Sequence, residues 1–113
     1  MKVRTVTQGR MKPRPVKCPK HLARVAGLPC LKCGARATVH HVTGYADRGG
    51  RLARSDRAVV PLCPRHHQIQ HGPWESVEAL SHRGFYRVYG IDLLAEAQRL
   101  ESESVAMGIL EEL

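Results

Sequence analysis

Two close pairs of metal-binding residue types occur in this chain of 113 residues. Cys30 and Cys33 are separated by two residues, as are Cys63 and His66, and 29 residues lie between the two pairs. A two-residue spacer lets both members of a pair reach one ion, and Zn²⁺ prefers four sulfur or nitrogen ligands in a closed tetrahedron. The spacing therefore predicts a structural zinc site. Cys18, which begins a similar local pair, remains an alternative to His66 as the fourth ligand.

Four further histidines, His40, His41, His67 and His71, bracket this predicted site. His67 and His71 are four residues apart on a predicted helix and would face the same way, whereas His40 and His41 are neighbours on a predicted strand and would face opposite sides. At most one of these two strand residues can bind a metal together with the helix. In a metal-assisted hydrolase one imidazole holds the ion while another takes a proton from water. We therefore predict a second, functional site, although a lone histidine is more often a core or capping residue.

Short elements must position these residues. The apolar spacing, the β-branched runs and the proline and glycine positions predict helices and strands in the order helix, strand, loop, strand, helix, helix, helix. In chain order the predicted ranges are 18–29 (ending at Gly27), 37–42, a loop over 44–57, 58–63, 64–71 (closed by Gly72), 74–88, and a last helix that starts at Leu93 behind Asp92. This pattern predicts an α+β fold, a small zinc-stabilised core with flanking N- and C-terminal helices. Residues 1–17 are expected to form a basic flexible arm, and residues 18–113 one domain.

Charge is distributed unevenly along the chain. The net charge is +8, yet residues 1–46 carry ten Lys or Arg and no carboxylate, while the remainder carries eight basic and ten acidic residues. A basic half of this kind suits a polyanion, because phosphate contacts release counterions, so we predict DNA as the partner; a solubilising tail is the alternative. Four arginines of the glycine-bearing loop are the predicted phosphate contacts: Arg48, Arg51, Arg54 and Arg57.

The chain carries no run of ~18–20 apolar residues and no apolar signal region near its start. We therefore expect no membrane partner and a location in the cytoplasm, where cysteines remain reduced. In a reducing compartment, cysteines are expected to bind metal ions and not to form disulfides.

The motifs together resemble a known family. The histidine pair HHV, the segment RSDRAVVPLCPRHHQIQHG and the knuckle LPCLKCG resemble the HNH nuclease signature within a treble-clef zinc scaffold (ββα-metal). With KCPKHLARVAG and FYRVYGIDLLAEAQRL, the match extends to phage and prophage HNH-like proteins related to the Ref (recombination enhancement function) nuclease, over about residues 17–100.

The resemblance implies a role for each matching residue. It implies that His41 is the general base, that Asp56 orients the loop of this histidine, and that His40, His67 and His71 bind the catalytic metal. Many HNH enzymes use a carboxylate ligand that suits Mg²⁺, whereas the all-imidazole set of this chain favours Zn²⁺, Mn²⁺ or Ni²⁺.

We therefore expect a metal-dependent DNA endonuclease of the HNH type, encoded by a phage or prophage and used in recombination or DNA processing in a bacterial cell. No predicted helix exposes a face of base-reading side chains, so little sequence specificity is expected. A non-catalytic zinc-finger DNA-binding accessory or regulator, and a protein-interaction zinc module, are the alternatives. A homodimer and a recombinase partner are left open.

Overall fold

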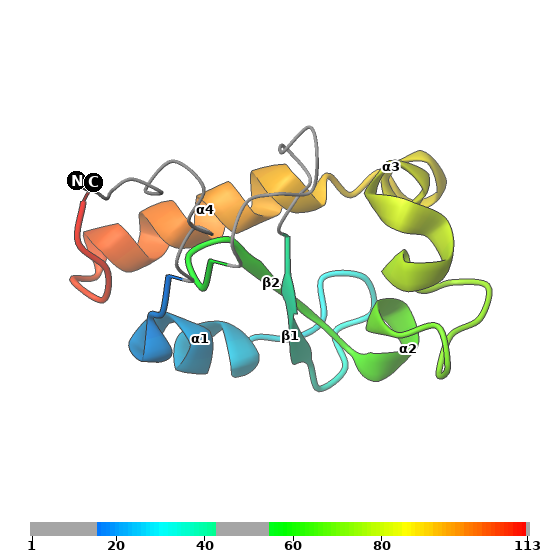
Figure 1. The fold of residues 1–113 in the computed structure, drawn as a ribbon, viewed down its shortest axis with the longest axis horizontal. Helices are drawn as coiled ribbons and strands as arrows, with labels where there is room; N and C mark the ends of the chain where they lie inside the picture. The colour runs from blue at the N-terminus through cyan, green and yellow to red at the C-terminus, as the bar shows by residue number, and fades with distance from the viewer. Residues whose placement is uncertain (1–15, 43–54, 113) are drawn as a thin grey trace, which may run out of the picture.

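The computed structural model describes residues 16–42 and 55–112 of the chain. Its elements in chain order are α1 (Pro19–Ala26), β1 (Thr38–His41), β2 (Val59–Leu62), α2 (Pro64–His67), α3 (Val77–Tyr89) and α4 (Leu93–Ala106). The α+β class is therefore confirmed. In Figure 1, α4 runs above and α1 below the beginning of β2, and α2 and α3 lie together to the right of the strands.

The two strands form an antiparallel sheet in which His40 pairs with Val60 and His41 with Val59. Every residue of β2 is buried. An uninterrupted apolar strand needs cover on both faces, and α1 and α4 both pack against β2. Both strands were predicted from their β-branched residues. The predicted ranges, 37–42 and 58–63, each extend one residue beyond the observed strand at both ends.

The helix α4 begins and packs as its sequence predicts. The side chain of Asp92 accepts a hydrogen bond from the backbone N–H of Ala95, at 3.1 Å, and so caps the first turn. Leu93, Ala97 and Leu100 recur at helical spacing and are each 1% exposed. They join the strand residues and the fully buried ring of Phe85 in one core, which holds the sheet rigidly in place.

The helix after β2 is shorter than predicted. We expected it to run over 64–71, but the backbone leaves the helical conformation at Gln68 (φ −111°, ψ 136°) and α2 ends at His67. The chain then turns back over the helix, so that a Cβ at Gly72 would lie 1.8 Å from the carbonyl oxygen of Arg65. Glycine at 72 therefore serves a close backbone approach, and not the end of a helix.

The predicted helix over 74–88 is also corrected. Trp74, the first residue of the predicted range, is 84% exposed and precedes the helix. α3 starts after Ser76, whose hydroxyl accepts from the N–H of Ala79 at 3.2 Å. The predicted single helix is also interrupted, at Ser81 (φ 70°, ψ 170°).

Two of the predicted segments lie mainly outside the described residues: the arm over 1–17 and the loop over 44–57. The end of each is described, and there Val16 and Ser55 form an isolated bridge. Within the described part of the chain, none of the helices is long and apolar enough to cross a membrane.

Candidate metal centre and histidine site

The ligand atoms of Cys30, Cys33, Cys63 and His66 all lie within 4.8 Å of one another. The Sγ atoms of Cys33 and Cys63 are 3.6 Å apart. The Nδ1 atom of His66 lies 3.8 Å from the Sγ of Cys30 and 3.2 Å from that of Cys63. Two pairs of residues that lie far apart along the chain thus converge on one point, and this group can hold a metal ion such as zinc.

These separations fit a tetrahedral zinc ion. With Zn–S near 2.3 Å and Zn–N near 2.0–2.1 Å, neighbouring ligands of a tetrahedron are about 3.5–3.8 Å apart. The sulfur atoms are too far apart for a disulfide, which needs about 2.05 Å, and all four cysteines of the chain are free. Burial raises the pKa of the Cys30 thiol, but hydrogen bonds from the backbones of Cys63, Cys33 and Lys32 outweigh burial and lower it overall, whereas burial raises the pKa of the Cys63 thiol. Of the two, Cys30 therefore forms the metal-binding thiolate more readily.

Local backbone geometry presents the ligands. Gly34 adopts a left-handed conformation (φ 78°), and its N–H donates to the carbonyl of Cys30 at 2.9 Å, which closes the knuckle. Pro64 starts α2 where a missing N–H costs nothing, so that His66 follows Cys63 within one turn. The ring of Tyr89 stands edge-on to that of His66, with centroids 5.9 Å apart.

Cys18 lies outside this group. It precedes the first turn of α1, and its backbone N–H donates to the Oδ2 atom of Asp56 at 3.0 Å. The preference for His66 over Cys18 as the fourth ligand therefore agrees with the structure.

A second site begins with the pair formed by His41 and Asp56. The Nε2 atom of His41 lies 2.9 Å from the Oδ1 atom of Asp56, and both side chains are largely buried. Burial raises the pKa of the Asp56 carboxyl, but the hydrogen bonds with His41 and with the Cys18 backbone outweigh it and lower that pKa. Asp56 is thus an ionised acceptor.

The acceptor fixes the proton on the ring. An ionised carboxylate only accepts hydrogen bonds, so the Nε2 atom of His41 must carry the hydrogen that it shares with Asp56. The Nδ1 atom of neutral His41 is then the lone-pair nitrogen, able to accept a proton. The structure therefore joins two residues that the sequence reading assigned to catalysis.

The ring of His40 meets the rings of two other histidines. Its ring centroid is 4.9 Å from that of His67 and 5.2 Å from that of His82. Burial, followed by the neighbouring charges of His67, His82 and His41, lowers the pKa of His40 to about 3. His40 is therefore a neutral imidazole at physiological pH, the form that binds metals.

His67 is held by the hydroxyl of Thr38. That hydroxyl donates its hydrogen to the carbonyl of Leu62 at 2.7 Å, so its oxygen accepts from the Nδ1–H of His67 at 2.9 Å. The Nε2 atom of His67 then carries the lone pair. Such a hydrogen bond to the far nitrogen is the usual partner of a metal-binding histidine.

The remaining predicted ligand, His71, is exposed in the turns after α2. The described ring contacts of His40 involve His67 and His82 instead. Sequence reasoning missed His82, because it lies in α3, and only the packing of α3 on α2 brings it back to β1. The spacing of the residues around His82 does not indicate that it binds a metal.

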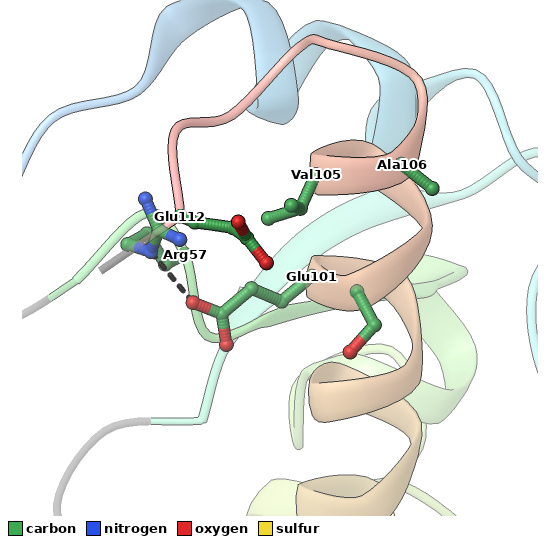
Figure 2. Close-up of a pocket in the computed structure, with 6 residues that line it drawn as sticks. Arg57, Glu101, Val105, Ala106 and Glu112 are labelled. Atoms are coloured by element: carbon green, nitrogen blue, oxygen red, sulfur yellow. Dashed lines mark hydrogen bonds and ion pairs between the residues drawn. The ribbon is translucent and has the colours of Figure 1, made fainter.

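Three of the predicted phosphate contacts, Arg48, Arg51 and Arg54, lie outside the described residues. Arg57 is described, and its guanidinium faces the end of α4: Nε donates to Glu101 at 2.6 Å and an Nη atom to the backbone of Glu111 at 2.8 Å. Figure 2 shows this pair beside a pocket of about 430 Å³, which Glu112 also lines. The two carboxylates disfavour a phosphate there, and Arg57 ties the strand to α4.

A protein-family model described as "Protein of unknown function (DUF968)" matches residues 8–108. Neither the curated proteins nor the solved structures contain a significant match to the chain.

Proposed function

This chain belongs to the DUF968 family, and we propose that it is a metal-dependent DNA endonuclease of the HNH type, a hydrolase of phosphodiester bonds. The observation that carries the proposal is the His41–Asp56 pair beside a group of neutral histidines. An oriented base next to a metal-binding group is what hydrolysis of an unactivated phosphodiester requires.

The order of the elements supports this assignment. A cysteine knuckle, an antiparallel strand pair and a short helix that carries the last metal ligand follow one another, and this order supports the proposal of a treble-clef zinc scaffold. The histidines project from the same strand and helix that this scaffold fixes. We infer that zinc bound by the Cys3His group holds the scaffold and takes no part in the chemistry.

His41 would act as the general base. Its Nδ1 atom takes a proton from the attacking water, while Asp56 holds the ring in the required tautomer and stabilises the imidazolium that forms. The Asp56 carboxylate is itself fixed by the Cys18 backbone. The two oxygens of one carboxylate thus connect the base to the start of α1.

A divalent cation would be held by His40 and His67, where it would neutralise charge on a phosphate oxygen and on the leaving 3′-oxygen. Neutral nitrogen ligands favour Zn²⁺, Mn²⁺ or Ni²⁺ over Mg²⁺. His40 and His41 are adjacent on β1, and the charge of His41 is among the influences that lower the pKa of both His40 and His67. This supports a base and a cation that are separate groups but lie within reach of one phosphodiester.

DNA is the proposed substrate because of the charge distribution. The first 46 residues carry ten basic side chains and no acidic ones, within a chain of net charge +8. Phosphate contacts of this kind give affinity without reading base sequence. We therefore propose cutting or nicking with little sequence specificity, and an ionic-strength-dependent affinity.

Nicking of supercoiled plasmid tests the proposal. Zinc-loaded protein is incubated with plasmid and with Mg²⁺, Mn²⁺ or added Zn²⁺, with a chelated sample as control. Nicked or linear product that depends on the added metal supports the endonuclease. DNA binding in a gel-shift assay, together with failure to cut under every metal, would leave the non-catalytic zinc-finger reading in its place.

A further inference from the structure

His82, which no sequence pattern indicated as a metal ligand, lies next to His40. The two Nε2 atoms are 3.0 Å apart, although the residues are 42 positions apart in the chain. Two nitrogen ligands on one cation at 2.0–2.1 Å stand about 2.9–3.4 Å apart when the angle between them is 90–109°. The separation therefore suits two ligands of one ion, as well as a hydrogen bond between neutral rings.

The backbone is distorted next to His82. Ser81 has φ 70° and ψ 170°, a conformation that side-chain-bearing residues rarely adopt, and it divides α3 into two segments. Its hydroxyl accepts from the N–H of Gly84 at 3.2 Å and so caps the second segment. Backbone strain of this kind is concentrated at active sites and ligand-binding residues. Here it starts a new helical segment whose first residue is His82.

The third ring is prepared for binding from the opposite side. Thr38 holds the Nδ1–H of His67, which leaves Nε2 as the lone-pair atom, and the ring lies edge-on to His40. Within the described chain the Cys3His set alone has all its ligand atoms inside 4.8 Å. Closing a three-histidine site thus requires rotation of a side chain, which is a small movement for a half-buried ring.

We propose that His82 is the third ligand of the cation held by His40 and His67, in the position that the sequence assigned to His71. The catalytic purpose of this cation rests on the proposed function, whereas the site itself is defined by the positions of the three rings. Three imidazoles from β1, α2 and α3 form it, and they select a borderline transition metal such as Zn²⁺, Mn²⁺, Ni²⁺ or Co²⁺. Binding would also fasten α3 to the strand.

Titration with Co²⁺ tests the proposal without reference to cleavage. Full-length protein is first loaded with one equivalent of Zn²⁺, and a second metal is then followed by calorimetry and by the visible absorption of Co²⁺. His82→Ala should weaken the second site at least tenfold, as His40→Ala does. His71→Ala, the matched control, should bind within about threefold of wild type.

A second pair of variants gives a direct spectroscopic answer. In His82→Cys the second cobalt should acquire a thiolate-to-cobalt charge-transfer band, and in His71→Cys it should not. This reading holds even if alanine at 82 weakens the fold. Wild-type affinity in His82→Ala, or a thiolate band confined to the variant at 71, overturns the proposal.

The metal site and the nuclease activity can be refuted separately. Tight binding of a second metal through His82 without any DNA cleavage would refute the nuclease and leave the site. Metal-dependent cleavage with the second metal unaffected by His82→Ala would refute the site and leave the nuclease.

Discussion

The carboxylate of Asp56 serves two neighbours at once. One oxygen receives the Nε2–H of His41, and the other receives the backbone N–H of Cys18. Because the second bond fixes the carboxylate, the histidine ring has one favoured orientation and one favoured tautomer. His41 is therefore held as a base whose Nδ1 lone pair is available to accept a proton.

Asp56→Asn should therefore reduce cleavage by about 10²-fold, with a smaller effect on DNA affinity. The amide can donate to Nε2, which moves the proton to Nδ1 and removes the accepting nitrogen of His41. Single-turnover cleavage rates measure the change. Asp92→Asn, the same substitution at the cap of α4, should cut like wild type because Asn caps as well as Asp. An Asp56→Asn protein with the wild-type rate would remove Asp56 from the mechanism.

His21 gives the fold a sensitivity to acid. It is fully buried and its Nδ1 atom lies 2.7 Å from the hydroxyl of Ser104. Burial, and then the charge of Arg24, lower its pKa, despite the opposing charge of Glu101. The unfolded chain, in which His titrates near pH 6.5, takes up this proton at higher pH than the folded chain does. Stability is therefore complete above about pH 6.5 and falls as the pH drops below that value.

The non-titrating variant His21→Asn should flatten this dependence. Denaturant unfolding at fixed excess zinc, between about pH 7 and pH 5, gives the free energy of unfolding of both proteins. The loss on acidification should be smaller in the variant, whatever its absolute stability. Equal slopes for the two proteins would show that His21 does not supply the acid sensitivity.

At the scale of elements, α3 shows what a local pattern leaves undecided. Its apolar residues predicted one helix over 74–88. The structure has a break at Ser81, where the serine hydroxyl caps the following segment. Similarly, α2 ends at His67, and the chain turns back over Arg65. Both outcomes depend on local turns and caps that the spacing of apolar residues does not reveal.

Opposite changes are expected from two substitutions at Ser81. Ser81→Gly removes the strain of the positive φ, but it also loses the hydroxyl cap, at a cost of about a few tenths of a kcal/mol, and adds unfolded-chain entropy, for a net gain of roughly 0.5–1 kcal/mol. Ser81→Ala keeps the strain and loses the cap, at a cost of about 1 kcal/mol. Thermal unfolding of zinc-loaded protein compares the two. If glycine destabilises the protein as much as alanine does, the backbone at 81 is not strained.

At the scale of the whole molecule, one metal group connects segments that are otherwise distant. Cys30 and Cys33 precede the sheet, and Cys63 and His66 follow it. Both pairs, and their convergence, were predicted from their spacing alone, since the chemistry of zinc demands four close ligands. The histidine site was predicted only in part. His40 and His67 converge as expected, but the partner from α3 depends on long-range packing.

Removal of zinc should therefore unfold the chain. Structural zinc supplies ~10–16 kcal/mol of apparent binding energy in small domains, and that binding energy is folding energy, so loss of one ligand should markedly lower the stability. Cys33→Ser is the informative variant, because Cys33 is exposed and its loss leaves no core cavity. Cys18→Ser is its control. Circular dichroism before and after chelation checks both, and a chelated chain that stays folded would contradict the structural role.

The most direct test of the central claim compares wild type with His41→Ala in single-turnover nicking of supercoiled plasmid. Both proteins carry structural zinc and receive the same saturating divalent metal, and circular dichroism confirms that both are folded. Nicking by wild type should depend on the metal, and the variant should nick about 10²–10⁴-fold more slowly, the range of a lost general base. Equal rates for the two folded proteins would contradict this role of His41.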